Sequence, residues 1–135
     1  MKTQTFLNEA GLKHTKTRQQ VLELLMNENR PVDAIEIFEL LKKHDTTVDQ
    51  VTIYRTLDIF FQKGLVEKLQ FQEGKFRYEL AGEEHHHLIC ERCGKITDVS
   101  DCGLDQMEKT IKRKKGFLVR RHSLEFFGVC SLCQQ

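Results

Sequence analysis

Two CxxC pairs constrain this chain more than any other feature of its sequence. Cys90 and Cys93 form the first pair, and Cys130 and Cys133 form the second, close to the last residue. Thiolates separated by two residues can bind one ion from a tight turn, and two such pairs complete a tetrahedral zinc site. Four protein ligands leave no open position, so we expect a structural zinc site. The alternatives, a redox-active CxxC pair or two unrelated pairs, do not explain the position of the second pair.

The bulk properties indicate a folded, cytoplasmic protein with no membrane partner. The chain has 39% hydrophobic residues, 30% charged residues and one proline among 135 residues, which is typical of an ordered protein. Its apolar runs are too short to cross a bilayer, and no signal-peptide segment is expected. Cysteines in a reducing compartment are mostly free thiols or metal ligands. Cys102 is the fifth cysteine, and we expect it to have no specific function. A redox-sensitive thiol or an extra zinc ligand is the alternative.

Residues 1–81 have the pattern of a winged helix-turn-helix DNA-binding domain. Apolar periodicity and capping residues predict three helices and then a hairpin of two strands, over 15–27, 34–43, 50–63, 65–71 and 75–80. Asp33 and Asp49 are plausible N-caps, Gly64 is the expected helix stop, and residues 72–74 form the expected hairpin turn. The third helix of such a domain enters the major groove. A three-helix scaffold with an incidental hairpin is the alternative.

The third predicted helix carries candidate DNA contacts near its N-terminal end. Thr52, Tyr54 and Arg55 lie where such a helix reaches base edges and phosphates. Tyr54 could equally belong to the core, and Arg55 could be a solvated charge. The 21 basic and 20 acidic residues of the chain are balanced, so net charge alone does not predict nucleic-acid binding.

Residues 82–135 predict a second, small domain after a short hinge at 81–83. We expect strands near 85–89 and 95–99, a charged helix over 104–115 and a strand over 117–127. A domain of this size has little core of its own, so a metal ion and a partner subunit are expected to stabilise it. The fold class expected for the chain is therefore α+β, with a winged helix followed by a small α/β domain. The basic run at 112–115 resembles a phosphate-binding patch, but a solvated helix end is the simpler interpretation.

The histidines between the two predicted domains suggest further metal sites. In a strand, His85 and His87 share one face, and Glu84 and His86 share the other. Glu79 and Asp98 could close a site with the first pair, and Asp105 and His122 could do so with the second. Mixed imidazole and carboxylate ligands suit Fe(II), Mn(II) or Zn(II). A surface run of histidines without a ligand is the alternative.

Several motifs in order resemble the ferric uptake regulator family. They cover nearly the whole chain: Gly11-Leu12-Lys13, Val51-Thr52-Ile53-Tyr54-Arg55, His85-x-His87-Leu88-Ile89-Cys90-x-x-Cys93-Gly94-Lys95 and His122-Ser123-Leu124. The resemblance implies a dimeric, metal-sensing repressor with a winged helix and a dimerisation domain. Its partners would be operator DNA and a second copy of the chain, without a small-molecule substrate.

The resemblance also implies roles for individual residues. They are structural zinc ligands at Cys90, Cys93, Cys130 and Cys133; regulatory metal ligands at Glu79, His85, His87 and Asp98; a further site at Glu84, His86, Asp105 and His122; and DNA contacts at Arg18, Thr52, Tyr54 and Arg55. One departure from the family concerns a regulatory histidine usually supplied by the DNA-binding domain. Pro31 stands about where it should be, so coupling would rest on Glu79 and the hinge, or on His14 or His44.

The function expected is metal-responsive transcriptional repression with Fe(II) as the first candidate signal. The carboxylates at Glu79 and Asp98 favour Fe(II) or Mn(II), whereas the segment from His122 to Cys130 is also similar to zinc-sensing members. A zinc sensor and a manganese or peroxide sensor are therefore alternatives. Outside the family, the rivals are a metal-dependent hydrolase and a zinc-stabilised protein-interaction module.

Overall fold

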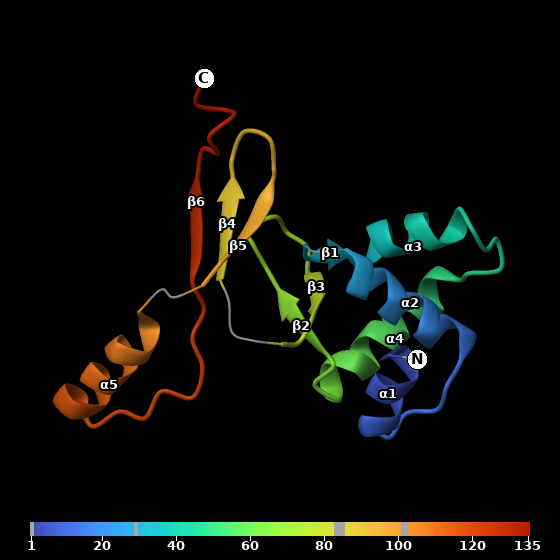
Figure 1. Ribbon diagram of the computed structural model, residues 1–135, viewed down its shortest axis with the longest axis horizontal. Coiled ribbons are helices and arrows are strands. Elements are labelled where there is room, and N and C mark those ends of the chain that lie inside the picture. Colours follow the sequence, from blue (N-terminus) through green and yellow to red (C-terminus); the bar gives the residue numbers. More distant parts are fainter. Residues whose placement is uncertain (1, 29, 83–85, 101–102) are drawn as a thin grey trace. The chain divides into compact units, whose positions relative to one another are not determined.

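The computed structural model describes residues 2–28, 30–82, 86–100 and 103–135. The chain forms two compact units, Met1–Gly82 and Glu83–Gln135, which are described separately here (Figure 1). Glu84, His85 and Cys102 lie outside the described residues. No described helix is both long enough and apolar enough to cross a membrane.

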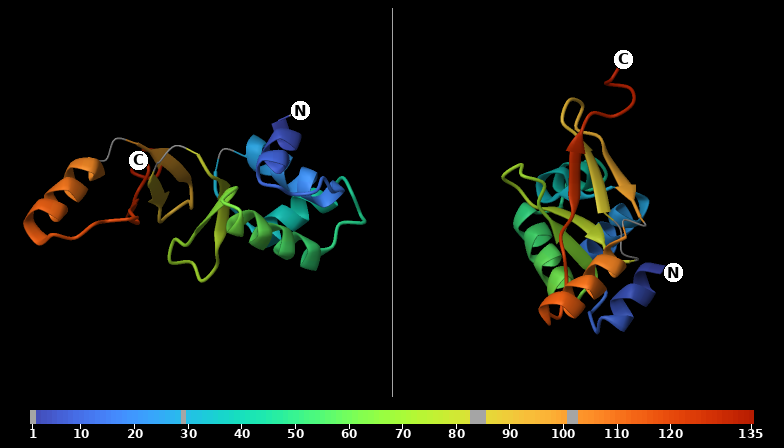
Figure 2. Two further views of the ribbon diagram at one scale, coloured as in Figure 1. Left: turned by 90° about the horizontal axis from the view of Figure 1, so that it is seen from below. Right: turned by 90° about the vertical axis from the view of Figure 1, so that its left-hand side faces the viewer.

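The first unit is a helical domain with a three-stranded sheet. Its helices are α1 (Lys2–Glu9), α2 (Lys16–Asn27), α3 (Ala34–Lys42) and α4 (Gln50–Gln62), and its strands are β1 (Val32–Asp33), β2 (Val66–Leu69) and β3 (Arg77–Leu80). The strand order is β1-β3-β2 with antiparallel pairs. The β2–β3 hairpin is the wing, and the helices gather on one common core (Figures 1 and 2). The winged helix expected from the sequence is therefore confirmed.

Local sequence signals explain where these helices begin and end. The Thr15 hydroxyl accepts a hydrogen bond from the Arg18 backbone N–H at 3.2 Å, and the Asp33 carboxylate accepts one from the Glu36 N–H at 2.9 Å, so both side chains satisfy free donors of a first helical turn. Asp49 stands at the N-cap of α4 but makes no capping bond. After α4, Gly64 takes a φ of +77°, which a glycine adopts without strain.

The apolar face of each helix meets in one core. Phe60, Leu57 and Ile53 of α4 are fully buried, and α2 and α3 add Leu22 and Ile37. The partners from the sheet are Val32 of β1 and Tyr78 of β3, which face each other in the strand register. Burial of apolar area stabilises a fold by about 25 cal/mol per Å², so this core stabilises the first unit and fixes the orientation of α4.

The second unit is a small mixed sheet with one helix. Its strands are β4 (His86–Cys90), β5 (Ile96–Val99) and β6 (Glu125–Gly128), its helix is α5 (Leu104–Lys115), and the strand order is β5-β4-β6. β4 pairs antiparallel with β5 and parallel with β6. The strand expected over 117–127 forms only at residues 125–128, because β6 pairs only where it faces β4, from His87 to Cys90.

Few side chains of the second unit are buried. Cys90, His86 and His87 are the buried residues of its described part, and α5 buries none. Leu88 and Phe126 on the sheet remain 40% and 45% exposed. A unit with so small a core needs another source of stability, such as a metal ion or a second copy of the chain.

Candidate metal centres

The sheet of the second unit brings the four paired cysteines together. Cys90 is the last residue of β4 and lies opposite Gly128 in the parallel β4–β6 pair, two residues before Cys130. Cys93 and Cys133 lie in the turns that follow β4 and β6, and these two strands leave the sheet at the same end (Figure 1). Ligand atoms of all four residues lie within 4.8 Å of one another. The parallel register is therefore what carries one CxxC pair to the other.

The distances and donors around these sulfurs suit a tetrahedral ion. The Sγ atoms of Cys93 and Cys130 are 3.8 Å apart, close to the edge of about 3.8 Å expected for a tetrahedron with Zn–S bonds of about 2.3 Å. Backbone N–H groups of Cys130 and Cys93 donate to Cys90 Sγ at 3.4 Å and 3.5 Å. These donors lower the pKa of Cys90 to about 6 and so favour the thiolate form that binds metal.

The thiol of Cys133 has a raised pKa because of its neighbours in the cluster. The hydrogen bond with Cys130 and burial among the other sulfurs raise the pKa of Cys133 to about 12. A divalent cation removes this penalty because it attracts each thiolate. The Arg92 guanidinium also donates to the Cys133 carbonyl at 2.9 Å, which holds the second turn beside the first.

A second cluster lies on β4 and β5. His87 pairs with Asp98 in the antiparallel register, and the distance from His87 Nε2 to Asp98 Oδ1 is 3.6 Å. This distance is too long for a hydrogen bond but close to the spacing of two ligands on one divalent ion. His87 is buried, whereas Asp98 is exposed. Glu79, another predicted ligand, lies on β3 of the first unit, and His85 falls outside the described residues.

A third cluster lies on the opposite face of β4. His86 Nε2 lies 3.0 Å from His122 Nε2, and His122 Nδ1 lies 3.1 Å from Glu108 Oε1. His86 Nδ1 is buried without a hydrogen-bond partner in the described part of the chain, which is costly for a polar atom. Imidazole and carboxylate donors of this kind suit a divalent cation.

Glu108 is the ligand candidate that sequence reasoning missed. The predicted set named Asp105, which lies one helical turn earlier on α5 and is exposed. Residues three apart on a helix share a face, so the spacing from Asp105 to Glu108 was the signal available in the sequence. Glu84, also predicted for this cluster, lies outside the described residues.

The predicted DNA contacts lie on the surface of the first unit. Thr52, Tyr54 and Arg55 all stand on the first turns of α4 and are exposed. Tyr54 is 42% exposed, so it is not a core residue. Arg18 lies on the first turn of α2, and its guanidinium donates to the Lys13 carbonyl at 2.9 Å.

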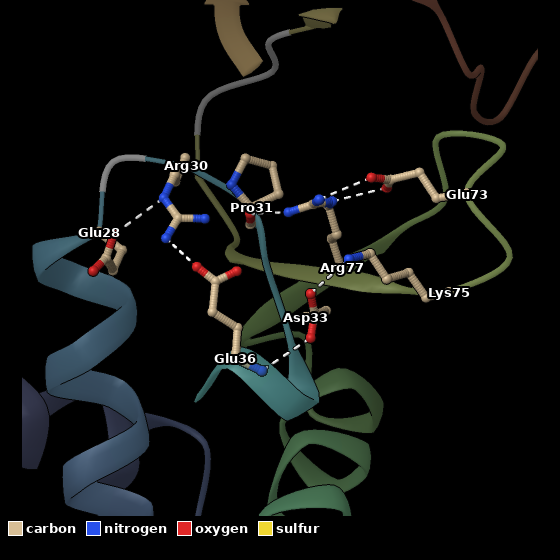
Figure 3. Close-up of polar contacts among 8 residues, drawn as sticks. All are labelled: Glu28, Arg30, Pro31, Asp33, Glu36, Glu73, Lys75 and Arg77. Carbon is tan, nitrogen blue, oxygen red and sulfur yellow. Dashed lines mark hydrogen bonds and ion pairs between the residues drawn. The ribbon is translucent and has the colours of Figure 1, made fainter. Parts of the chain in front are cut away.

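Charged side chains surround Pro31, the position at which the resemblance stated above would imply a regulatory histidine (Figure 3). Arg30 pairs with Glu28 at 3.3 Å and also with Glu36. Arg77 of the wing donates to the Pro31 carbonyl at 3.2 Å. Residues 28–36 contain no histidine, and the carboxylates of Glu28 and Glu36 are paired with Arg30, so this segment offers no imidazole ligand and no unpaired glutamate.

The wing is tied to α3 by the same network. The Arg77 guanidinium donates twice to the Glu73 carboxylate, both at 2.8 Å, and lowers the pKa of that carboxyl group. Lys75 Nζ lies 2.9 Å from Asp33 Oδ2. Burial acts to raise the pKa of Asp33, but hydrogen bonds from the Glu36 N–H and from Lys75 outweigh it and lower the pKa. The wing is therefore held to the helix by ionised carboxylates.

Comparison with known proteins assigns the chain to a family. The model of the ferric uptake regulator family matches residues 9–127. The peroxide operon regulator of Bacillus subtilis is 35% identical over 129 residues, which are 96% of this chain and 89% of that protein. Among solved structures, the Vibrio cholerae ferric uptake regulator has a TM-score of 0.80 at 32% identity, covering 96% of this chain and 100% of the other.

The Helicobacter pylori ferric uptake regulator, described as having three functional metal binding sites, has a TM-score of 0.82 at 25% identity. The alignment covers 99% of this chain and 90% of that one. The fold, the four-cysteine cluster and these relatives agree on the same class of protein. The chain belongs to the ferric uptake regulator family of metal-responsive, DNA-binding transcriptional regulators.

Proposed function

We propose that the protein is a homodimeric repressor whose affinity for operator DNA rises when Fe(II) binds at His87 and Asp98. The observation that carries the proposal is the spacing of 3.6 Å between these two side chains, one buried and one exposed. His85 and Glu79 are proposed as further ligands because they match the ligand positions of the family. Mn(II) and Zn(II) are the alternative ions for this donor set.

The four cysteines would hold a structural zinc ion, which supplies a tetrahedral cross-link. Cys90 and Cys93 fix one end of the β4–β5 hairpin, and Cys130 and Cys133 fasten the segment after β6 to it. Because no position stays open for a substrate, these residues act in folding rather than in catalysis. The relatives reported above are transcriptional regulators, which argues against a metal-dependent hydrolase.

Binding of the regulatory ion would act by a population shift. Glu79 lies two residues before the segment 81–85 that joins the units, and His87 lies two residues after it. An ion held by both would favour those arrangements of the units in which both ligands reach it. A ligand shifts the equilibrium between two conformations only if it binds one of them more tightly than the other. Glu79 would supply this difference in affinity, because it can bind the ion in only some arrangements of the units. Arg18, Thr52, Tyr54 and Arg55 are the proposed DNA contacts.

Peroxide sensing is a second candidate signal, favoured by the Bacillus subtilis relative at 35% identity, which is a peroxide operon regulator. In that case the iron-loaded protein would lose DNA affinity after exposure to hydrogen peroxide, and His85 or His87 would gain one oxygen atom. Mass spectrometry of the histidine-containing peptide separates this candidate from simple iron sensing, which leaves the histidines unchanged.

The test is DNA affinity under anaerobic conditions, with operator duplexes first selected from randomised DNA by the Fe(II)-loaded wild-type protein. His87→Ala should abolish the increase in affinity on adding Fe(II) while keeping the zinc content of the wild type. Thr97→Ala, which changes an exposed residue of β5 next to Asp98, is the matched control and should respond normally. A full response of His87→Ala to metal would exclude this site as the sensor.

A further inference from the structure

Residues 109–124, which we call the basic arm, carry the densest positive charge in the chain. The basic arm contains seven lysines and arginines and no aspartate or glutamate. The remaining 14 of the 21 basic residues face all 20 acidic residues elsewhere in the chain. The net charge of +1 is therefore the sum of +7 on the basic arm and −6 on the rest of the chain.

All seven cations of the basic arm are exposed. They are Lys109, Lys112, Arg113, Lys114, Lys115, Arg120 and Arg121, and none forms an ion pair with a residue that the structure describes. In the first unit, by contrast, Lys16, Lys75 and Arg77 are held by Asp45, Asp33 and Glu73. The arm thus offers exposed charge to an external anion, whereas four of the twelve lysines and arginines of the first unit already have carboxylate partners.

The helix dipole accounts for only part of this charge. Cations on the last turn of a helix are stabilised by about 0.3–1 kcal/mol each, within that turn. This applies to the four consecutive cations Lys112–Lys115 at the end of α5. The helix dipole does not act on Arg120 and Arg121, because both lie beyond the end of α5. The helix ends at Gly116, which has a φ of +63°, and the chain then turns back toward β6 (Figures 1 and 2).

The arrangement of these charges favours a nucleic-acid backbone over a membrane surface. Helical residues are about 100° apart around the axis, so four consecutive cations surround the end of α5 instead of forming one polar face. α5 has an apolar stripe of Leu104, Met107 and Ile111, but at about 100° per residue Lys114 and Lys115 lie on the same side of the helix as this stripe. A helix that lies on a lipid surface keeps its cations opposite its apolar face. Phosphates along a duplex are closely and regularly spaced anions, and an isolated, all-round cluster of lysine and arginine suits them.

We propose that the basic arm is a second, sequence-independent DNA contact that binds backbone phosphates. The proposal rests on the DNA-binding function proposed above and adds a surface outside the winged helix to it. Release of counterions from DNA supplies the binding free energy, and each phosphate contact adds about 0.9 to the slope of log K against log salt. One contact is therefore worth roughly eightfold in affinity at 0.1 M salt.

The test compares two double variants of the full-length, zinc-loaded protein on a long random-sequence duplex. Lys114→Gln/Lys115→Gln removes two charges from the end of α5. Lys43→Gln/Lys63→Gln removes two charges from residues that cap the C-terminal ends of α3 and α4, so it matches the first variant in charge and in position on a helix. Lys114→Arg/Lys115→Arg keeps the charge and checks for a purely structural effect.

We expect Lys114→Gln/Lys115→Gln to lower the salt slope by about 1 to 2 and the affinity at 0.1 M salt by about 8- to 60-fold. The arginine variant should bind like the wild type, and the control variant should lose less than half as much in slope. Equal losses in the two glutamine variants would overturn the proposal, because net charge alone would then explain them. So would an unchanged slope in Lys114→Gln/Lys115→Gln.

Two further outcomes separate this proposal from its alternatives. Binding of the wild type to vesicles of phosphatidylglycerol and phosphatidylcholine in equal amounts, lost in Lys114→Gln/Lys115→Gln while DNA binding stays, would overturn it in favour of a lipid surface. If Lys114→Gln/Lys115→Gln binds DNA like the wild type and still responds to metal, the basic arm is excluded and the proposed function stands. A wild type that binds no DNA in any metal state would refute the proposed function itself.

Discussion

Replacing Cys133 with serine should release the zinc ion and unfold residues 83–135 while residues 1–82 stay folded. Cys133 belongs to the four-cysteine cluster whose ligand atoms lie within 4.8 Å of one another. The second unit has three buried side chains among its described residues, and two of them are histidines. Its sheet therefore depends on the cross-link between the two CxxC turns.

The size of the effect follows from loop closure. The cross-link from Cys90 to Cys133 closes a loop of about 44 residues, and the chain-entropy relation for a cross-link of that length gives about 4 kcal/mol. Domains have a free energy of unfolding of about 0.05–0.15 kcal/mol per residue, or roughly 3–8 kcal/mol for a unit of this size. Loss of the cross-link thus removes an amount comparable to the whole stability of the second unit.

Two probes separate the units in this assay. Both tyrosines, Tyr54 and Tyr78, lie in the first unit, so tyrosine fluorescence follows that unit alone. Hydrogen exchange of the β4 and β6 amides follows the second unit, and a chromophoric chelator counts the zinc. Cys102→Ser, which changes a cysteine outside both pairs, is the control and should behave like the wild type. Retention of zinc and of protected β4 amides in Cys133→Ser would refute the reasoning.

Three other tests concern the first unit. Phe60→Ala should lower the free energy of unfolding by about 3–5 kcal/mol, since Phe60 is fully buried. Phe61 is 47% exposed, so Phe61→Ala should change the free energy of unfolding by about 0.5 kcal/mol or less. Chemical denaturation followed by tyrosine fluorescence measures both effects. Asp33→Asn should cost about 1 kcal/mol or less at neutral pH. The folded-state pKa of Asp33 is lowered, so its contribution is present above about pH 4 and is lost as the pH falls through the folded pKa; the variant should show a flatter stability curve in this range. Tyr54→Ala should reduce DNA affinity without changing the zinc content, as measured by fluorescence anisotropy and metal analysis.

Each of these predictions has a result that contradicts it. Equal effects of Phe60→Ala and Phe61→Ala would mean that the two rings do not differ in burial. An acid profile of Asp33→Asn identical to that of the wild type would show that the Glu36 N–H and Lys75 do not lower the pKa of Asp33 in the folded protein. Unchanged DNA affinity in Tyr54→Ala would favour the protein-interaction module over the DNA-binding surface of α4.

Helices α2 to α5 and the hairpin could be predicted from the sequence because their signals are local, whereas α1 (Lys2–Glu9) was not predicted. Thr15 and Asp33 cap the helices that follow them, and Gly64 ends α4. β1 was missed because it has two residues and forms through pairing of Val32 with Tyr78, which are far apart in the chain. The last strand was predicted too long for a related reason, since its extent is set by its partner β4 and not by its own apolar residues.

In the candidate sites too, features that depend on local residue spacing could be predicted, and contacts that depend on the packing of distant elements could not. Cysteine spacing was sufficient to predict a four-sulfur cluster, because each CxxC pair is a local unit. Alternation of side chains along a strand also predicted that His86 and His87 lie on opposite faces of the sheet. The contact of His122 with Glu108 depends on how α5 lies beside the segment before β6, and the ion pairs of Arg30 depend on how α2 meets α3. Neither was accessible from residue spacing.

The most direct test of the account is an anaerobic count of metal ions on reduced protein, before and after chelation and after adding back Fe(II), Mn(II) or Zn(II). We expect one zinc ion per chain that resists chelation and a second ion that exchanges. Asp98→Ala should lose the exchangeable ion and keep the zinc. The ion that holds the second site at the lowest free concentration identifies the signal. If only the resistant zinc ever binds to the wild type, His87 and Asp98 form no sensor and the central claim is wrong.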